Sequence, residues 1–318
     1  MCTLDTFCFS VRMYMEKISN IRWIKIMSQK EIRKKNFLLV FNHRAGKGSS
    51  DSKKDIIEKF LQKNNCDYKV TRAGNLSNEM DFSEYDAVVA VGGDGTILKI
   101  IPFLANTDIK LGIIPCGTAN LFAASLCIPT NIHKAINILL QDSITKVDIG
   151  KAGNKFFALR VGIGFDADVV NNTKRSWKRK VGYLAYLTQG IINSFKLSCK
   201  SYKITIDDSI YEVNANSIII ANAGNMFKNL FNVAPSGSVN DGKLDISIIL
   251  AKNLWEFASV FFKILVGKHN LGSKVIYKQA QNIKIQSIYR NIHIDGEPFY
   301  NSDLDISIIP KALKVVVP

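Results

Sequence analysis

Three glycines, an acid and a threonine stand together at residues 92–96, where the chain reads Gly-Gly-Asp-Gly-Thr. Glycines let backbone N–H groups turn tightly and approach phosphate oxygens, and the threonine offers a hydroxyl. A carboxylate repels phosphate, so we expect the acid to engage magnesium or to orient its neighbours. The run lacks the GxxxxGK[ST] spacing of a Walker loop. These residue types predict the nucleotide-phosphate site of a kinase, formed by Gly92, Gly93, Asp94, Gly95 and Thr96.

Two further acidic turns could take part in phosphoryl transfer. Asp295 and Glu297 flank a glycine directly after a strand-like segment, and a base near an attacking hydroxyl is what such a reaction needs. The same run also reads as an ordinary β-hairpin turn, as does Asp241-Gly242. Asp166 follows another strand-like segment, where a role in supporting a cleft and a purely structural role both remain open.

The first half of the chain carries the pattern of a doubly wound sheet. Residues 87–91 form a short apolar run, as expected of a strand that is buried on both faces. A glycine turn and a helix through residue 104 follow it. Further strands are predicted at 37–41, 68–71 and 111–114, with helix-length segments between them. Ligands bind at the carboxyl ends of such parallel strands, which is where the glycine loops stand.

The pattern changes after about residue 148. Strand-like segments follow one another, and several alternate apolar with polar residues, which predicts an antiparallel sheet with one exposed face. These strands are expected at 156–163, 203–206, 217–223, 243–250, 274–279, 283–286, 291–294 and 304–309, with helices at 178–195 and 254–266. A β-rich domain therefore follows the α/β domain.

Composition narrows the class of partner. The net charge of +15 favours an acidic one: nucleic acid, an anionic membrane surface or nucleotide phosphates. No run of about 18 uncharged apolar residues predicts a transmembrane helix. The six cysteines are scattered, which favours reduced thiols in the cytosol, and the four isolated histidines argue against a zinc site.

A basic cluster precedes the helix expected at 178–195. It is either the solvated start of that helix or a docking surface for anionic phospholipid, where each basic residue contributes about 1 kcal/mol. The cluster comprises Lys174, Arg175, Lys178, Arg179 and Lys180.

Five motifs in one order resemble the diacylglycerol kinase catalytic family, which includes bacterial lipid kinases and sphingosine kinases. The resemblance runs from Asn36 to the C-terminus. Besides residues 92–96, the motifs are Pro115-x-Gly117-Thr118-x-Asn120, Gly162-x-Gly164-Phe165-Asp166-Ala167, Ala234-Pro235 with Asp241-Gly242-x-Leu244-Asp245, and Asp295-Gly296-Glu297-Pro298.

The resemblance implies a two-domain fold with the active site in the cleft between the domains. A basic extension (1–35) precedes a doubly wound α/β nucleotide-binding domain (36–147) and a β-sandwich domain (148–312), and residues 313–318 form a last strand that returns to the first domain. Glu297, with Asp295 beside it, is implied as the proton acceptor. Magnesium is implied at Ser238, Asp241 and Lys243, the outer two through backbone carbonyls. The implied ATP-binding residues are Asn42, His43, Arg44, Ala45, Gly46, Thr71, Gly92, Gly93, Asp94, Gly95, Thr96, Ile97, Leu98 and Thr118.

The function implied is that of an ATP- and magnesium-dependent lipid kinase of phospholipid biosynthesis. It would transfer the γ-phosphoryl group to a hydroxyl of diacylglycerol or a related lipid, in the cytoplasm at the inner face of the membrane. Two departures, His43 for the usual proline and Leu121 for the usual acid, leave a non-catalytic relative open. An NAD kinase is the rival enzyme, although its Asn-Glu element is not found. Nucleic-acid binding is not expected, because no aromatic-plus-basic motif supports it. The sequence leaves the acceptor lipid and a homodimer open.

Overall fold

The computed structural model describes residues 34–42, 50–141, 143–172, 199–222, 225–226, 231–232, 238–251, 255–256, 259–260, 274–287, 291–301 and 303–318. His43 to Gly46 of the first loop, the basic cluster 174–180 and the helix expected at 178–195 lie outside these residues. Of the helix expected at 254–266, residues 255–256 and 259–260 are described, and they are helical.

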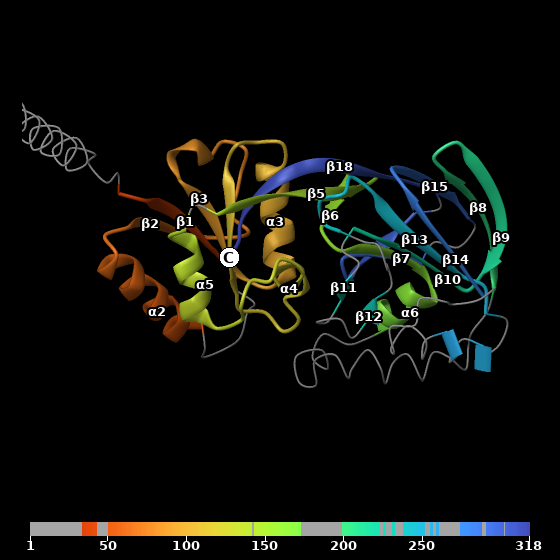
Figure 1. The fold of residues 1–318 in the computed structure, drawn as a ribbon, viewed down its shortest axis with the longest axis horizontal. Coiled ribbons are helices and arrows are strands. Elements are labelled where there is room, and N and C mark those ends of the chain that lie inside the picture. The colour runs from red at the N-terminus through yellow and green to blue at the C-terminus, as the bar shows by residue number, and fades with distance from the viewer. Residues whose placement is uncertain are drawn as a thin grey trace, which may run out of the picture.

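Four parallel strands form the centre of the N-terminal domain, in the order β2-β1-β3-β4. The strands are β1 (Asn36–Phe41), β2 (Asp67–Arg72), β3 (Ala87–Gly92) and β4 (Lys110–Pro115). The helices are α2 (Ser50–Lys63), α3 (Asp94–Leu104), α4 (Leu121–Ser125) and α5 (Ile132–Leu139), with the short η1 (Phe82–Glu84). Figure 1 shows α3 and α4 on the side of this sheet that faces the second domain, and α2 and α5 on the other.

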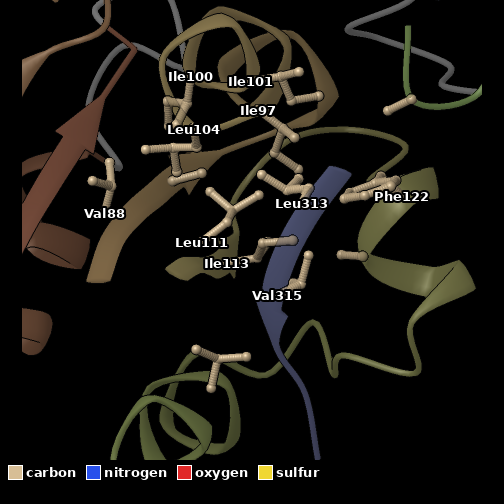
Figure 2. Packing of buried hydrophobic residues seen from close by; sticks show 14 of the residues in the cluster. Val88, Ile97, Ile100, Ile101, Leu104, Leu111, Ile113, Phe122, Leu313 and Val315 are labelled. Atoms are coloured by element: carbon tan, nitrogen blue, oxygen red, sulfur yellow. The ribbon is translucent and has the colours of Figure 1, made fainter. Parts of the chain in front are cut away.

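Two apolar cores lie on the two faces of this sheet. On β1, Leu39 belongs to the core that contains Ile57 and Leu61 of α2. Its neighbour Leu38 belongs to the core that contains Ile97 of α3 and Phe122 of α4. Figure 2 shows the core around Ile97 and Phe122, hereafter the first core. Because successive side chains of a strand point to opposite faces, burial on both faces requires the unbroken apolar runs seen in the sequence.

Strands β18 (Asp303–Val316) and β5 (Ile144–Ala152) connect the two domains, and they pair with each other along both halves of β18 (Figure 1). The C-terminal part of β18 also pairs in parallel with β4, so Leu313 and Val315 lie in the first core (Figure 2). A bulge interrupts the ladder between Ile309 and Leu313. A single sheet therefore runs from one domain into the other, and the boundary expected at residue 148 falls inside β5.

The second domain is an antiparallel sandwich, which confirms the predicted fold class. One layer continues the large sheet through β18-β15-β8-β9, and the other has the order β14-β13-β10-β7-β16-β17. Isoleucines of both layers, Ile204 and Ile285 on one and Ile163 and Ile246 on the other, share one core. The remaining elements are β6 (Lys155–Phe157), β7 (Arg160–Gly164), α6 (Phe165–Asn172), β8 (Lys200–Ile206), β9 (Ser209–Ala215), β10 (Ser217–Ala221), β11 (Asn225–Met226), β12 (Phe231–Asn232), β13 (Leu244–Ile249), β14 (Val275–Ala280), β15 (Asn282–Gln286), β16 (Asn291–Ile294) and β17 (Glu297–Tyr300).

One strand prediction is wrong in its extent. The segment 156–163 was expected to be continuous, but it divides into β6 and β7 at Ala158 and Leu159. The N–H groups of these two residues bind the carboxylate of Asp295 instead of a neighbouring strand. A distant side chain therefore ends a strand that the local apolar pattern would continue. Among the helices that the structure describes, none is long and apolar enough to span a membrane.

Candidate active site

The two glycine loops of the N-terminal domain touch each other through their backbones. Gly92 and Pro115 are partners in the β3–β4 ladder, and the Cys116 N–H donates to the carbonyl of Gly92 at 2.8 Å. A Cβ atom on Gly117 would lie 2.5 Å from the Cα of Gly93. Since backbone atoms cannot rotate away, only glycine fits here, and the two motifs form one continuous backbone surface.

Asp94, in the loop 92–96, binds the chain directly after the other glycine loop, residues 115–120. Its carboxylate accepts the Leu121 N–H at 3.1 Å and the Phe122 N–H at 3.0 Å. These are orphan donors at the start of α4, where an acidic side chain also compensates the helix dipole. Burial raises the pKa of Asp94, and the two N–H donors act in the opposite direction. Of the two roles expected for this acid, the hydrogen bonds show that it orients its neighbours.

Asn120 closes the loop 115–120 through hydrogen bonds to Gly117. It adopts a left-handed backbone conformation with φ of 50°. Its side-chain oxygen accepts the Gly117 N–H at 2.8 Å, and its amide donates to the Gly117 carbonyl at 2.9 Å. The side chain of Asn120 is almost fully buried, whereas Thr118, which lies between Gly117 and Asn120 in the sequence, is exposed. Asn120 thus holds Thr118 at the surface of the loop.

Thr96 does not present its hydroxyl at the surface, contrary to the sequence-based expectation. The residue is 1% exposed, and a Cβ atom on Gly92 would lie 2.2 Å from its Oγ1. Ile97 is buried in the first core (Figure 2). Leu98 packs against that core. Contacts of residues 96–98 with a nucleotide would therefore involve the backbone. Gly95 differs, because it is exposed and a Cβ atom there would meet nothing within 4 Å.

Two further candidate ATP-binding residues stand at the same edge of the parallel sheet. Asn42 directly follows β1, and Thr71 lies near the carboxyl end of β2; both are half-buried. The neighbouring positions His43 to Gly46 are outside the described residues.

Asp295 and Gly296 form a two-residue hairpin turn between β16 and β17. Their φ angles of 47° and 83° are both positive, which identifies a type I′ turn. The Asp295 carboxylate accepts N–H groups of Ala158 at 2.6 Å, Leu159 at 3.0 Å and Arg160 at 2.7 Å. Burial raises the pKa of Asp295 to about 7, although these donors work against the rise. Asp295 therefore anchors the turn, whereas Glu297 is exposed.

The turn lies at the junction of the two domains. Ala158 and Leu159, whose N–H groups bind Asp295, belong to the core of the N-terminal domain. Strand β6, which directly precedes Ala158, also lies against α3, the helix that begins at Asp94. The structure therefore brings together the glycine loops of one domain and the acidic turn of the other.

The loop that contains the expected magnesium ligands is held by Asp148, a residue that the sequence analysis missed. This carboxylate is fully buried and accepts the Gly242 N–H and the Lys311 N–H, each at 2.6 Å. Its own N–H donates to the Val239 carbonyl at 2.7 Å. An acid inside the apolar run Val-Asp-Ile of a strand was the signal that could have revealed it.

The oxygen atoms of this loop suit a magnesium ion. Asp241 is exposed, and one of its two oxygens accepts the Lys243 N–H at 3.0 Å. A carboxylate together with backbone carbonyls at Ser238 and Lys243 would supply the oxygen ligands that Mg²⁺ prefers, with water completing the octahedron. Across the described part of the chain, no group of three or more His, Cys, Asp or Glu side chains is close enough to hold a metal ion.

The sequence of this chain is similar to those of diacylglycerol kinases. Residues 36–152 match the model of the diacylglycerol kinase catalytic domain, and residues 159–317 match that of the YegS C-terminal NAD kinase beta sandwich-like domain. A diacylglycerol kinase of Staphylococcus epidermidis is 32% identical over 218 residues, which cover 68% of this chain and 69% of the relative. That of Bacillus subtilis is 30% identical, covering 76% and 82%. An uncharacterized protein of Synechocystis is 29% identical, covering 88% and 70%.

Solved structures show the same fold. One from Bacillus anthracis gives a TM-score of 0.74 at 24% identity and covers 91% of this chain and 98% of its own. A diacylglycerol kinase structure from the same organism gives 0.69 at 23% identity, covering 90% and 97%.

Proposed function

This chain belongs to the diacylglycerol kinase catalytic domain family, and from that premise we propose that it is an ATP-dependent lipid kinase. It transfers the γ-phosphoryl group of ATP to a hydroxyl group of diacylglycerol or a related lipid. The acceptor class rests on the relatives, four of which are named diacylglycerol kinase at 30–32% identity.

The observation that carries the proposal is the meeting of two motif loops at the domain junction. The glycine loops present a backbone surface suited to phosphate, and Gly95 leaves room for a close approach. On the other domain the exposed Glu297 follows a turn whose Asp295 binds the N–H groups of Ala158 and Leu159, next to the strand β6 that lies against α3. Phosphoryl transfer needs this combination of a phosphate cradle and a base on opposite sides of the reacting atoms.

Each group has one task in the proposed reaction. Backbone N–H groups of residues 92–95 and the exposed Thr118 hold the phosphates of ATP. The Glu297 carboxylate accepts the proton of the lipid hydroxyl while the hydroxyl oxygen of the lipid bonds to the γ-phosphorus of ATP. The bond between the γ-phosphorus and the oxygen that bridges it to the β-phosphate breaks, which releases ADP. Asp295 keeps the turn in place. A magnesium ion held by Asp241 with the carbonyls of Ser238 and Lys243 would neutralise phosphate charge.

The lipid acceptor requires that the enzyme work at a membrane surface. The basic cluster 174–180 is the proposed contact with anionic phospholipid at the inner face of the membrane. Co-sedimentation with vesicles tests this contact: binding should rise with anionic lipid content and fall with salt. Binding that ignores both variables would refute it.

A kinase assay with radiolabelled ATP tests the function itself. The purified chain is incubated with mixed vesicles containing diacylglycerol, monoacylglycerol, ceramide or sphingosine, and in parallel with NAD. We expect label in a lipid product whose mass exceeds that of its substrate by one phosphoryl group, and none in NAD. Label in NADP alone would contradict the proposal.

A further inference from the structure

A fully buried histidine lies directly behind the acidic turn. His293 is on β16, two residues before Asp295, and its side chain points away from the core that holds Ile292 and Ile294. Its Nδ1 accepts the Gly296 N–H at 3.2 Å, and its Nε2 lies 2.7 Å from Asp166. Because Nδ1 is an acceptor, the ring proton is assigned to Nε2, which donates to Asp166.

Asp166 in turn is held by an arginine. The Arg160 guanidinium lies 2.9 Å from the Asp166 carboxylate. Burial alone would raise the pKa of Asp166, but the charge of Arg160 and the hydrogen bonds from His293 and Arg160 lower it to about 2. The carboxylate is therefore ionised at neutral pH, which keeps it an acceptor for the His293 Nε2–H.

The contacts form a closed ring around the turn. The backbone of Arg160 donates its N–H to the Asp295 carboxylate at 2.7 Å and accepts the Asp295 N–H at 2.9 Å. From Arg160 the ring continues through Asp166 and His293 to the N–H of Gly296, the neighbour of Asp295. Both residues of the turn are thus hydrogen-bonded to the same framework.

Gly162 provides the space for this ring. It is the partner of His293 in the β7–β16 ladder. A Cβ atom on Gly162 would lie 2.0 Å from the Asp166 Oδ2 and 2.3 Å from the His293 Nε2. The absence of a side chain at this position lets the histidine and the acid approach each other across the strand.

We propose that His293 is a positioning residue for the phosphoryl transfer, an inference that rests on the proposed function. Its imidazole accepts the N–H of Gly296 and so fixes the position of the backbone directly before Glu297. Asp166 and Arg160 fix the imidazole. Glu297 is exposed and starts the edge strand β17, so the turn before it determines where its carboxylate lies. Misplacement of a reacting group by about 1 Å can cost about 100-fold in rate.

Two substitutions of similar size separate the contacts of His293. His293→Asn keeps an acceptor at the position of Nδ1, for the Gly296 N–H, and loses the bond to Asp166. His293→Gln keeps a donor at the position of Nε2, for Asp166, and loses the acceptor for Gly296. We expect kcat for the lipid substrate to fall about 10- to 100-fold in His293→Gln and less than about 5-fold in His293→Asn. The KM for ATP should not change in either variant.

Hydrogen exchange of the turn decides the structural half of the inference independently of activity. The Gly296 amide should lose protection in His293→Gln and keep it in His293→Asn. Equal kcat values in two variants of equal thermal stability, or equal protection, would overturn the inference. If His293→Gln does not fold, Gly162→Ala takes its place, because its methyl group would lie 2.3 Å from the His293 Nε2 and so displaces the imidazole from the Gly296 N–H. An unchanged kcat in a Gly162→Ala variant whose Gly296 amide has lost protection would also overturn the inference.

Failure of the proposed function looks different. If the wild-type chain phosphorylates no lipid, the catalytic role of the ring is refuted together with that function. The exchange data would then still show whether His293 holds the turn.

Discussion

Replacing Asp94 should destabilise the N-terminal domain, because this carboxylate caps α4. Asp94→Ala leaves the N–H groups of Leu121 and Phe122 without their acceptor. A hydrogen bond to a charged group contributes about 1.5–3 kcal/mol. The cost of burying the charge, seen in the raised pKa of Asp94, offsets part of the sum of the two bonds. We expect a net loss of about 2–4 kcal/mol in the free energy of unfolding. Asp94→Asn, which keeps one oxygen, should lose about half as much.

Thermal unfolding and ATP kinetics measure the two consequences. At about 2–4 °C per kcal/mol, the melting temperature of Asp94→Ala should fall by about 4–16 °C. Because α4 follows the loop that presents Thr118, the KM for ATP should rise about 10-fold or more. The matched control is Asp55→Ala, which removes an exposed carboxylate of α2. It should leave the melting temperature and the KM for ATP unchanged.

The dependence on magnesium separates the cap from a metal ligand. As a cap, Asp94 should leave the magnesium concentration for half-maximal activity unchanged after substitution. An Asp94→Ala variant with wild-type thermal stability and a greatly increased magnesium requirement would refute this account of the residue.

Three further predictions concern the acidic turn and the glycine loops. Glu297→Gln should lower lipid phosphorylation by about 10²–10⁴-fold, while the stability of this exposed position changes by less than about 0.5 kcal/mol; substantial turnover in the folded variant would remove Glu297 as the base. The pKa of Asp295 is raised to about 7 in the folded state, so between about pH 4 and 7 the folded state holds a proton that the unfolded state has released. The part of the free energy of unfolding that this proton contributes is therefore fully present below about pH 4 and is lost as the pH rises through 7. Urea unfolding should show the wild-type protein losing about 2–4 kcal/mol relative to Asp295→Asn over that window, and parallel curves would contradict it. Gly117→Ala should weaken ATP binding and stability together, because its methyl group meets the backbone of Gly93, whereas Gly95→Ala should spare stability and weaken ATP binding; isothermal titration and melting curves that show the reverse would refute the loop geometry.

Much of the fold was predictable, because the parallel strands of the first domain are buried on both faces and read as unbroken apolar runs. The same runs could not reveal where β18 lies. Its N-terminal half belongs to the sandwich and its C-terminal half to the first core, and only the resemblance indicated the return of residues 313–318. The division of 156–163 into β6 and β7 depends on Asp295, more than 130 residues further along the chain. Local periodicity carries no information on such a contact.

The candidate site was predictable in its motifs but not in the tasks of its side chains. Glycine positions imply close approach, yet the sequence does not say whether a ligand or another backbone approaches. The backbone of Gly93 occupies the space where a side chain of residue 117 would lie, whereas the corresponding space at Gly95 is empty. The buried residues Asp148 and His293 act through backbone N–H groups of distant loops. Their partners are set by the tertiary fold, so spacing in the sequence could not identify them.

The most direct test of the central claim is lipid phosphorylation by the wild-type chain and by Glu297→Gln under identical conditions. Diacylglycerol in anionic vesicles, radiolabelled ATP and magnesium are supplied, and the product is identified by mass. The account predicts a phosphorylated lipid from the wild-type chain and a rate of lipid phosphorylation at least about 10²-fold lower from the variant. A wild-type chain that forms no phosphorylated lipid, or a variant that forms it equally well, would contradict it.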